Sequence, residues 1–252
     1  FHDAGGMPAL LWQLKDRLDL DALCVDGQSL GAAIEGAKVW DDKVICRPDA
    51  PVTDRPALAV LKGSLAPGGA VIKPSAASPA LLRHEGRAVV FDGPADLAAR
   101  IDVEDIAADD ILVLRGGGPV GAPGMPEWGN LQIPKALLKK GVVDMVRISD
   151  ARMSGTHYGT CILHVSPESA VGGPLALVRS GDRIALDVAA GRLDLLVDEA
   201  TLAERRLDWK KPAAPSRGWP ALYVAHVGQA QDGCDFDFLQ TDGTPLKEPE
   251  IF

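Results

Sequence analysis

Short apolar runs follow one another through most of this chain and are separated by Gly, Pro and Asp, a pattern typical of β-strands. Several connections between the runs are too short to hold the crossover helix that parallel pairing usually needs, which disfavours a doubly wound parallel sheet. We therefore expect a β-rich α/β fold, a closed or nearly closed β-barrel flanked by helices. The expected strands cover residues 57–63, 69–73, 87–92, 111–115, 143–148, 161–165, 175–178, 183–188 and 192–197.

Helices and turns are expected between and after these strands. The sequence Ala189-Ala190-Gly191 separates the last two runs and predicts a hairpin. Helices are expected at 95–100, 134–140 and 199–206, the second with Pro134 in its first turn. Residues 208–220 are expected to be irregular, and 235–238 to form a short strand.

The first 50 residues have a different character. Apolar residues at helical spacing over 7–14 predict a helix that ends near Asp19, and Ser29 is a candidate N-cap for a short helix through Ala37. Prolines at 48 and 51 then break the pattern. We place a boundary there, between a short helical segment at 1–50 and the barrel domain at 51–252. The chain begins at Phe1 without an initiator Met, and we expect it to be part of a longer polypeptide.

Charge and composition disfavour several classes of partner. The net charge is −9, and no basic run is longer than two residues, which argues against nucleic acid and an anionic membrane. No apolar stretch approaches the roughly 20 residues that span a bilayer. Gly116–Gly118 does not match a dinucleotide-binding or P-loop motif. The chain is expected to be cytoplasmic and reduced, because its cysteines are scattered: Cys24, Cys46, Cys161 and Cys234.

Two glycine-rich segments each follow a β-like run. They are GGGPVGAPGMPEWGN at 116–130 and VRISDARMSGTHYGT at 146–160. Glycine allows the backbone to approach a ligand closely, so we expect the two segments to form two walls of a polar pocket. The polar residues that they offer to this pocket are Glu127, Ser154 and Thr156.

The residues alone leave two interpretations of these side chains open. Ser154 is either a base or nucleophile activated by a positive neighbour, or, with Thr156, a turn residue bonded to its own backbone. Glu127 is either a ligand for a hard cation such as Mg²⁺, or an exposed glutamate at the start of a helix. Asp150 and Arg152 are expected to hold the second segment in shape, and His164 to lie at the boundary of the core.

Several motifs resemble the dihydroxy-acid dehydratase/6-phosphogluconate dehydratase family over nearly the whole chain. PGMPE-x-GN and RISDARMSGT are similar to the sugar-acid branch, which includes the arabinonate and xylonate dehydratases. The amino-acid biosynthetic members usually show a TDGRFSG-like turn where this chain has SDARMSG. The further matching segments are FHDAGGMPALL (1–11), IKPSA (72–76) and HVSPESAVGGPLALVRSGDRIALDV (164–188).

The resemblance implies a specific site and a specific division of labour. Members have a larger N-terminal domain that carries an iron–sulfur cluster on three cysteines and most of a Mg²⁺ site, and a C-terminal β-barrel. Glu127 matches the magnesium ligand of the barrel, Ser154 matches the proposed base, and Thr156 matches the neighbouring hydroxyl. None of the four cysteines falls at a cluster-ligand position, so these ligands are expected in the N-terminal domain.

The resemblance also implies an activity. We expect the C-terminal portion of an iron–sulfur- and Mg²⁺-dependent hydro-lyase that converts a sugar acid, such as arabinonate or xylonate, to a 2-keto-3-deoxy acid. It would act as a homo-oligomer, and this portion alone would be inactive. The alternatives are a branched-chain dihydroxy-acid dehydratase of amino-acid biosynthesis and a non-catalytic barrel module.

Overall fold

The computed structural model describes residues 1–53, 56–128, 131–154 and 158–239. The chain divides into two compact units, Phe1–Arg55 and Pro56–Phe252, and each is described here by itself. The sequence placed the boundary at 50/51. That the first unit belongs to an N-terminal domain stays a prediction.

The first unit contains two short helices, α1 (Gly6–Gln13) and α2 (Leu30–Ile34), and a 3-10 turn at Lys15–Arg17. The Ser29 hydroxyl accepts the Ala32 N–H at 3.2 Å, which confirms the predicted N-cap. The helix ends at Ile34, earlier than predicted. A small apolar cluster supports the unit, formed by Ala4, Ala9 and Ile45.

The second unit is built on one eight-stranded sheet with the order β1-β2-β6-β5-β4-β3-β7-β8. The central strands β3, β4, β5 and β6 are parallel neighbours, and the flanking pairs are antiparallel. The strands are β1 (Ala59–Leu61), β2 (Gly69–Ile72), β3 (Arg83–Asp92), β4 (Ile111–Arg115), β5 (Arg147–Ser149), β6 (Cys161–Ser166), β7 (Arg183–Asp187) and β8 (Arg192–Leu195).

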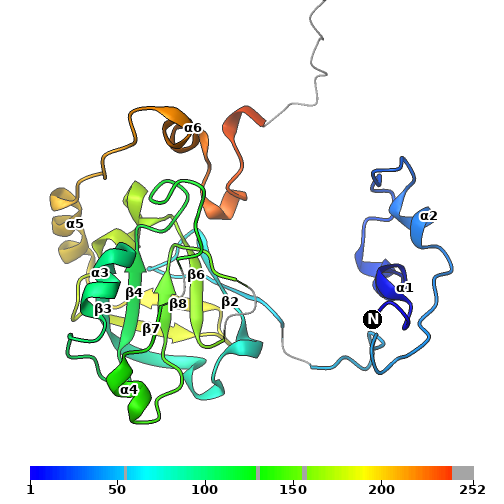
Figure 1. The fold of residues 1–252 in the computed structure, drawn as a ribbon, viewed down its shortest axis with the longest axis horizontal. Helices are drawn as coiled ribbons and strands as arrows, with labels where there is room; N and C mark the ends of the chain where they lie inside the picture. The colour runs from blue at the N-terminus through cyan, green and yellow to red at the C-terminus, as the bar shows by residue number, and fades with distance from the viewer. Residues whose placement is uncertain (54–55, 129–130, 155–157, 240–252) are drawn as a thin grey trace, which may run out of the picture. The chain divides into compact units, whose positions relative to one another are not determined.

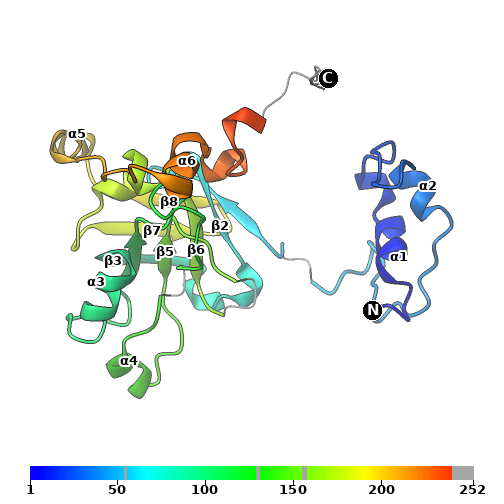
Figure 2. The ribbon, with the colours of Figure 1, turned by 45° about the horizontal axis from the view of Figure 1, so that its top comes forward.

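The sheet curls until its two ends meet (Figures 1 and 2). Just past β1, the Lys62 N–H donates to the Gly191 carbonyl at 2.8 Å, and the Leu193 N–H donates to the Lys62 carbonyl at 3.1 Å. These bonds join the β1 end of the sheet to β8. The predicted barrel is therefore confirmed, as is the hairpin between β7 and β8. The parallel pairing of the central strands was not predicted.

The helices agree with the sequence at three places and differ at others. The predicted helices appear as α3 (Gly93–Arg100), α4 (Lys135–Lys139) and α5 (Glu199–Asp208). The helix α6 (Gly218–His226) was not predicted, and it begins within residues 208–220, which were expected to be irregular. Its Gly218 and Pro220 look like breakers in sequence, yet proline is compatible with a first helical turn. The 3-10 turns are Pro74–Ala76, Pro79–Leu81, Ser169–Val171, Pro174–Leu177, Ala230–Asp232 and Asp237–Leu239.

Two strand predictions are wrong. A strand was predicted at 175–178, but residues 174–177 form a 3-10 turn that begins at Pro174. The side chains of Leu175 and Leu177 are buried although they belong to no strand. Residues 235–238 give one isolated bridge, between Phe236 and Val227, and then a 3-10 turn. In both places the apolar side chains suggested a strand, but the backbone lacks the regular pairing that defines one.

The core has two layers that meet at β4. Ile111 and Val113 face the interior of the barrel, whereas Leu112 and Leu114 pack outside it with the α3 residue Leu97. Because side chains alternate along a strand, burial on both faces explains why β4 is apolar throughout. Among the described residues, no helix is long and apolar enough to cross a membrane.

Candidate active site

The two glycine-rich segments leave the same end of the barrel. One follows β4 and begins at Gly116, and the other follows β5 and begins at Asp150. Because β4 and β5 are parallel neighbours, their carboxyl ends lie side by side, which is where open parallel sheets commonly bind ligands. Figures 1 and 2 show α6 and α4 at opposite ends of these strands.

Asp150 joins the starts of the two segments. Its side chain is buried and accepts the Gly117 N–H at 2.9 Å, the Gly116 N–H at 3.3 Å and both the N–H and the hydroxyl of Ser169 at 2.9 and 2.6 Å. The carboxylate therefore fixes the triple glycine against the strand end by hydrogen bonds to backbone. Asp150 therefore holds the first segment in shape, whereas the sequence predicted this role for it in the second segment.

Arg152 joins the two segments further along. Its Nη1 atom lies 3.0 Å from Oε1 of Glu127, and its Nε donates to the Met125 carbonyl. Both side chains of the ion pair are about half exposed, at 44% and 50%. Glu127 lies in the loop, outside the first turn of α4, so the helix-start interpretation is wrong. An exposed carboxylate at this position is open to a cation.

Ser154 lies two residues beyond Arg152 in the same segment and is half-buried. The Arg152–Glu127 pair therefore places the backbone that carries Ser154 beside the loop that carries Glu127. Thr156, the third predicted site residue, lies outside the described residues. The roles of all three as base, neighbouring hydroxyl and metal ligand stay predictions.

The far end of the Ser154 segment is anchored by Asp144. This buried carboxylate accepts the Thr160 N–H and hydroxyl at 2.8 and 2.7 Å and lies 3.0 Å from Arg147 Nη2. The same Arg147 nitrogen donates to the Tyr158 carbonyl at 3.2 Å. Burial raises the pKa of Asp144, but the hydrogen bonds from Thr160 and Ser78 outweigh it and leave the pKa below its usual value of 3.8.

Three non-glycine residues with positive φ gather beside the ion pair. They are Met125 at 45°, His164 at 54° and Cys234 at 55°. The Cys234 Sγ lies 3.5 Å from the Met125 Sδ, and burial, together with the charge of Arg152, lowers the pKa of His164. Such backbone strain costs about 1–3 kcal/mol per residue and clusters at functional sites. The sequence did not point to Met125 and Cys234, because neither methionine nor cysteine is a residue type that indicates a positive φ.

Glu168 is a third residue that the sequence did not reveal. It is 1% exposed and accepts the Val120 and Gly121 N–H groups, both at 2.8 Å, and the Gln229 side-chain amide at 2.7 Å. Burial raises its pKa. A Cβ on Gly118 would lie 2.5 Å from Glu168 Oε2, so glycine is required there. The close approach of Glu168 to the backbone explains why the run at 116–118 has glycine at position 118.

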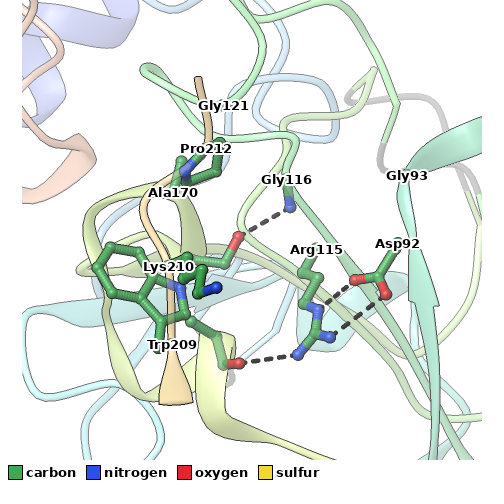
Figure 3. Close-up of a pocket in the computed structure, with 11 residues that line it drawn as sticks. Asp92, Gly93, Arg115, Gly116, Gly121, Ala170, Trp209, Lys210 and Pro212 are labelled. Carbon is green, nitrogen blue, oxygen red and sulfur yellow. Dashed lines mark hydrogen bonds and ion pairs between the residues drawn. The ribbon is translucent and has the colours of Figure 1, made fainter. Parts of the chain in front are cut away.

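A separate pocket of about 400 Å³ lies on the other side of Gly116 (Figure 3). Arg115 crosses it, donating from Nη1 to the carbonyls of Ala176 and Val178 at 2.9 and 3.0 Å and pairing with Asp92. These bonds tie the end of β4 to the 3-10 turn Pro174–Leu177, to the residue that follows this turn and to the end of β3. Neither Glu127 nor Ser154 lines this pocket.

The described residues fit one group that the resemblance implies and not the other. Glu127 is a hard oxygen donor on an exposed loop and fits a single ligand of Mg²⁺. No set of three His, Cys, Asp or Glu side chains in the described ranges is placed to hold a metal ion. Cys161 is buried, which raises its pKa to about 11, and the four cysteines are free. The described residues therefore do not supply a ligand set for an iron–sulfur cluster.

Comparisons with known proteins show the family of the chain. Residues 43–234 match the family model described as "Dihydroxy-acid/6-phosphogluconate dehydratase C-terminal". The chain is 52% identical to a 6-deoxy-6-sulfo-D-gluconate dehydratase of Pseudomonas putida, over 100% of this chain and 44% of that protein.

Two further relatives carry other names. An L-arabonate dehydratase of Azospirillum brasilense is 50% identical, over 95% of this chain and 43% of the relative. A dihydroxy-acid dehydratase of Methanoregula boonei is 44% identical, over 92% and 42%. The chain thus spans less than half the length of each, and it belongs to the dihydroxy-acid/6-phosphogluconate dehydratase family, whose C-terminal domain it matches over residues 43–234.

Proposed function

We propose that this chain is the C-terminal domain of a sugar-acid dehydratase, in which Ser154 is the base and Glu127 is one ligand of Mg²⁺. The substrate class is a C5 or C6 aldonate, such as arabinonate or xylonate, and the product is a 2-keto-3-deoxy acid. The observation that carries the proposal is the Arg152–Glu127 ion pair, which brings the two predicted residues' loops together at the carboxyl ends of parallel strands.

The reaction sets a clear task for these residues. A proton leaves C2, hydroxide leaves C3, and the resulting enol tautomerises to the 2-keto acid. The C2 proton is weakly acidic because it lies beside a carboxylate anion. Ser154 Oγ must act as an alkoxide to remove it, and a serine needs positive neighbours to reach that state. Arg152 supplies one fixed positive charge two residues away.

Glu127 would hold the metal from the side of the barrel. When bound, Mg²⁺ supplies positive charge to the substrate carboxylate and the 2-hydroxyl, where negative charge develops. Glu127 is half exposed and held by a single ion pair in the described part of the loop, so it can turn toward a cation at small cost. The other metal ligands and the iron–sulfur cluster are proposed to lie in the N-terminal domain.

The sugar-acid assignment rests on two supports. Three relatives named for sugar acids are 52%, 50% and 47% identical, against 44% for a dihydroxy-acid dehydratase, whereas a D-xylonate dehydratase is 40% identical. The turn SDARMSG at 149–155 also differs from the TDGRFSG-like form of the amino-acid branch. The branched-chain acid is therefore the second candidate substrate, and a non-catalytic barrel is the third possibility.

A substrate profile tests the assignment. The full-length protein, with its N-terminal domain, is incubated with C5 and C6 aldonates and with 2,3-dihydroxyisovalerate, and 2-keto acid formation is measured. We expect turnover of at least one aldonate at a kcat/KM well above that for the branched-chain acid. Turnover of the branched-chain acid alone would overturn the sugar-acid assignment. A protein that turns over none of these acids would overturn the proposed dehydratase activity.

The working protein is proposed to be a cytoplasmic homo-oligomer whose site is shared between this domain and the N-terminal domain. The exposed half of Glu127 fits that arrangement, since a metal with one ligand here needs further ligands from elsewhere. Size-exclusion chromatography with light scattering on the full-length protein measures the oligomeric state directly.

A further inference from the structure

Gln229 and Glu168 bind each other through two reciprocal hydrogen bonds. The Gln229 side-chain Nε2 donates to Glu168 Oε1 at 2.7 Å, and the Glu168 backbone N–H donates to Gln229 Oε1 at 3.0 Å. The two residues are far apart in sequence. Their contact ties the C-terminal part of the described chain to the turn that follows β6.

The far side of the same carboxylate holds the first glycine-rich segment. Glu168 accepts the backbone N–H groups of Val120 and Gly121, both at 2.8 Å. It is almost fully buried, so each donor that it loses is not replaced by water. Gln229 thus supplies one of the three side-chain or backbone donors that hold this carboxylate in position.

Residues 228–235 then return to the loop that carries Glu127. The Cys234 N–H donates to the Gln229 carbonyl at 3.1 Å, and the Gly228 N–H donates to the Asp235 carbonyl at 2.8 Å. This turn sets Cys234 Sγ at 3.5 Å from Met125 Sδ, two residues before Glu127. Gln229 therefore contributes to the hold on this loop at two points, at Val120–Gly121 through Glu168 and at Met125 through the turn at 228–235. The Arg152 contacts with Met125 and Glu127 hold the loop independently of Gln229.

We infer that Gln229 is a positioning residue of the active site, which fixes the Glu127 loop through Glu168 and through the turn at 228–235. The inference rests on the proposed function for its effect on catalysis. The hold on the loop itself follows from the contacts and is measurable without any substrate.

Hydrogen–deuterium exchange of the full-length protein, read on peptides that cover 118–124, tests the hold. We expect Gln229→Ala to exchange there about tenfold faster, as the loss of a hydrogen bond to a charged group implies. Gln231→Ala is the matched control, because Gln231 lies in the same turn but bonds to the Ser166 hydroxyl. It should leave these peptides within about twofold of wild type. Equal rates in wild type and Gln229→Ala, or equal acceleration in both variants, would overturn the inference.

A like-charge variant guards against a change that merely destabilises the protein. Gln229→Glu places a second carboxylate against Glu168 and should give faster exchange on the same peptides than Gln229→Ala. Exchange no faster than in Gln229→Ala would contradict the pairing.

Catalysis gives the second readout. In Gln229→Ala, the Mg²⁺ concentration for half-maximal rate should rise about tenfold, while kcat at saturating Mg²⁺ stays within about twofold, because the loop is loosened but its residues are intact. A lower kcat with an unchanged Mg²⁺ requirement would overturn the positioning role. If wild type turns over no aldonate, the proposed function fails and the exchange data still decide the hold.

Discussion

Arg152 Nη1 lies 3.0 Å from Oε1 of Glu127 and joins loops that leave two neighbouring strands. The pair is half exposed, so its own contribution to stability is small, about 0–1 kcal/mol. Its importance is geometric. It sets the carboxylate and the segment that carries Ser154 on one side of the barrel end, where a substrate can contact both.

Glu127→Gln in the full-length protein should separate metal binding from stability. The amide is a weaker ligand for Mg²⁺ than the carboxylate, so we expect the Mg²⁺ concentration for half-maximal rate to rise about tenfold or more. Thermal unfolding should change by less than the equivalent of about 1 kcal/mol. Glu204→Gln, at an exposed position on α5, is the control and should change neither quantity. An unchanged Mg²⁺ titration in Glu127→Gln would refute the ligand role.

Gly159→Ala should be far more destabilising than an ordinary glycine substitution. Gly159 has φ +113°, and an added Cβ would lie 1.7 Å from Arg147 Nη2, which is buried and bonded to Asp144. Gly181→Ala is the matched control, with φ +101° and open space around its Cβ. We expect the Gly159 variant to lose about 2 kcal/mol more than the control in chemical unfolding. Equal losses would show that the Arg147 contact is unimportant.

The lowered pKa of Asp144 predicts that the free energy of unfolding decreases at acid pH. Its pKa is lowered in the folded protein, so its contribution is present above the usual value of 3.8 and is lost as the pH falls below it, through the folded pKa. Asp144→Asn should cost about 3 kcal/mol at neutral pH, because the buried charge of Arg147 then lacks the carboxylate that balances it. It should also flatten the loss of stability below pH 4. Parallel stability curves for wild type and variant across that range would contradict this assignment.

The barrel was predictable because strand periodicity and connection length are local properties. The β7–β8 hairpin, the Ser29 cap and the three outer helices follow from short stretches of sequence. The parallel centre of the sheet does not, since pairing direction depends on how distant segments close. The error at 174–177 has a related cause, because an apolar run records burial of Leu175 and Leu177 but not whether they pair.

The site was predictable only in part. Glycine spacing and the family motifs pointed to Glu127 and Ser154, and the structure brings their loops together through Arg152. Glu168 and Gln229 gave no signal, because a buried carboxylate bound to backbone N–H groups has no spacing rule in sequence. Contacts between residues so far apart become visible only once the chain is folded.

The central claim is that Ser154 removes the C2 proton of a sugar acid. The most direct test is Ser154→Ala in the full-length protein, with the rate of 2-keto acid formation measured on the best aldonate and the folding checked by thermal unfolding. Ser216→Ala, at an exposed serine outside the site, is the control. We predict that Ser154→Ala lowers kcat by at least about 1,000-fold with an unchanged unfolding temperature, while the control keeps the wild-type rate. A Ser154→Ala enzyme that retains a rate near wild type would contradict the account.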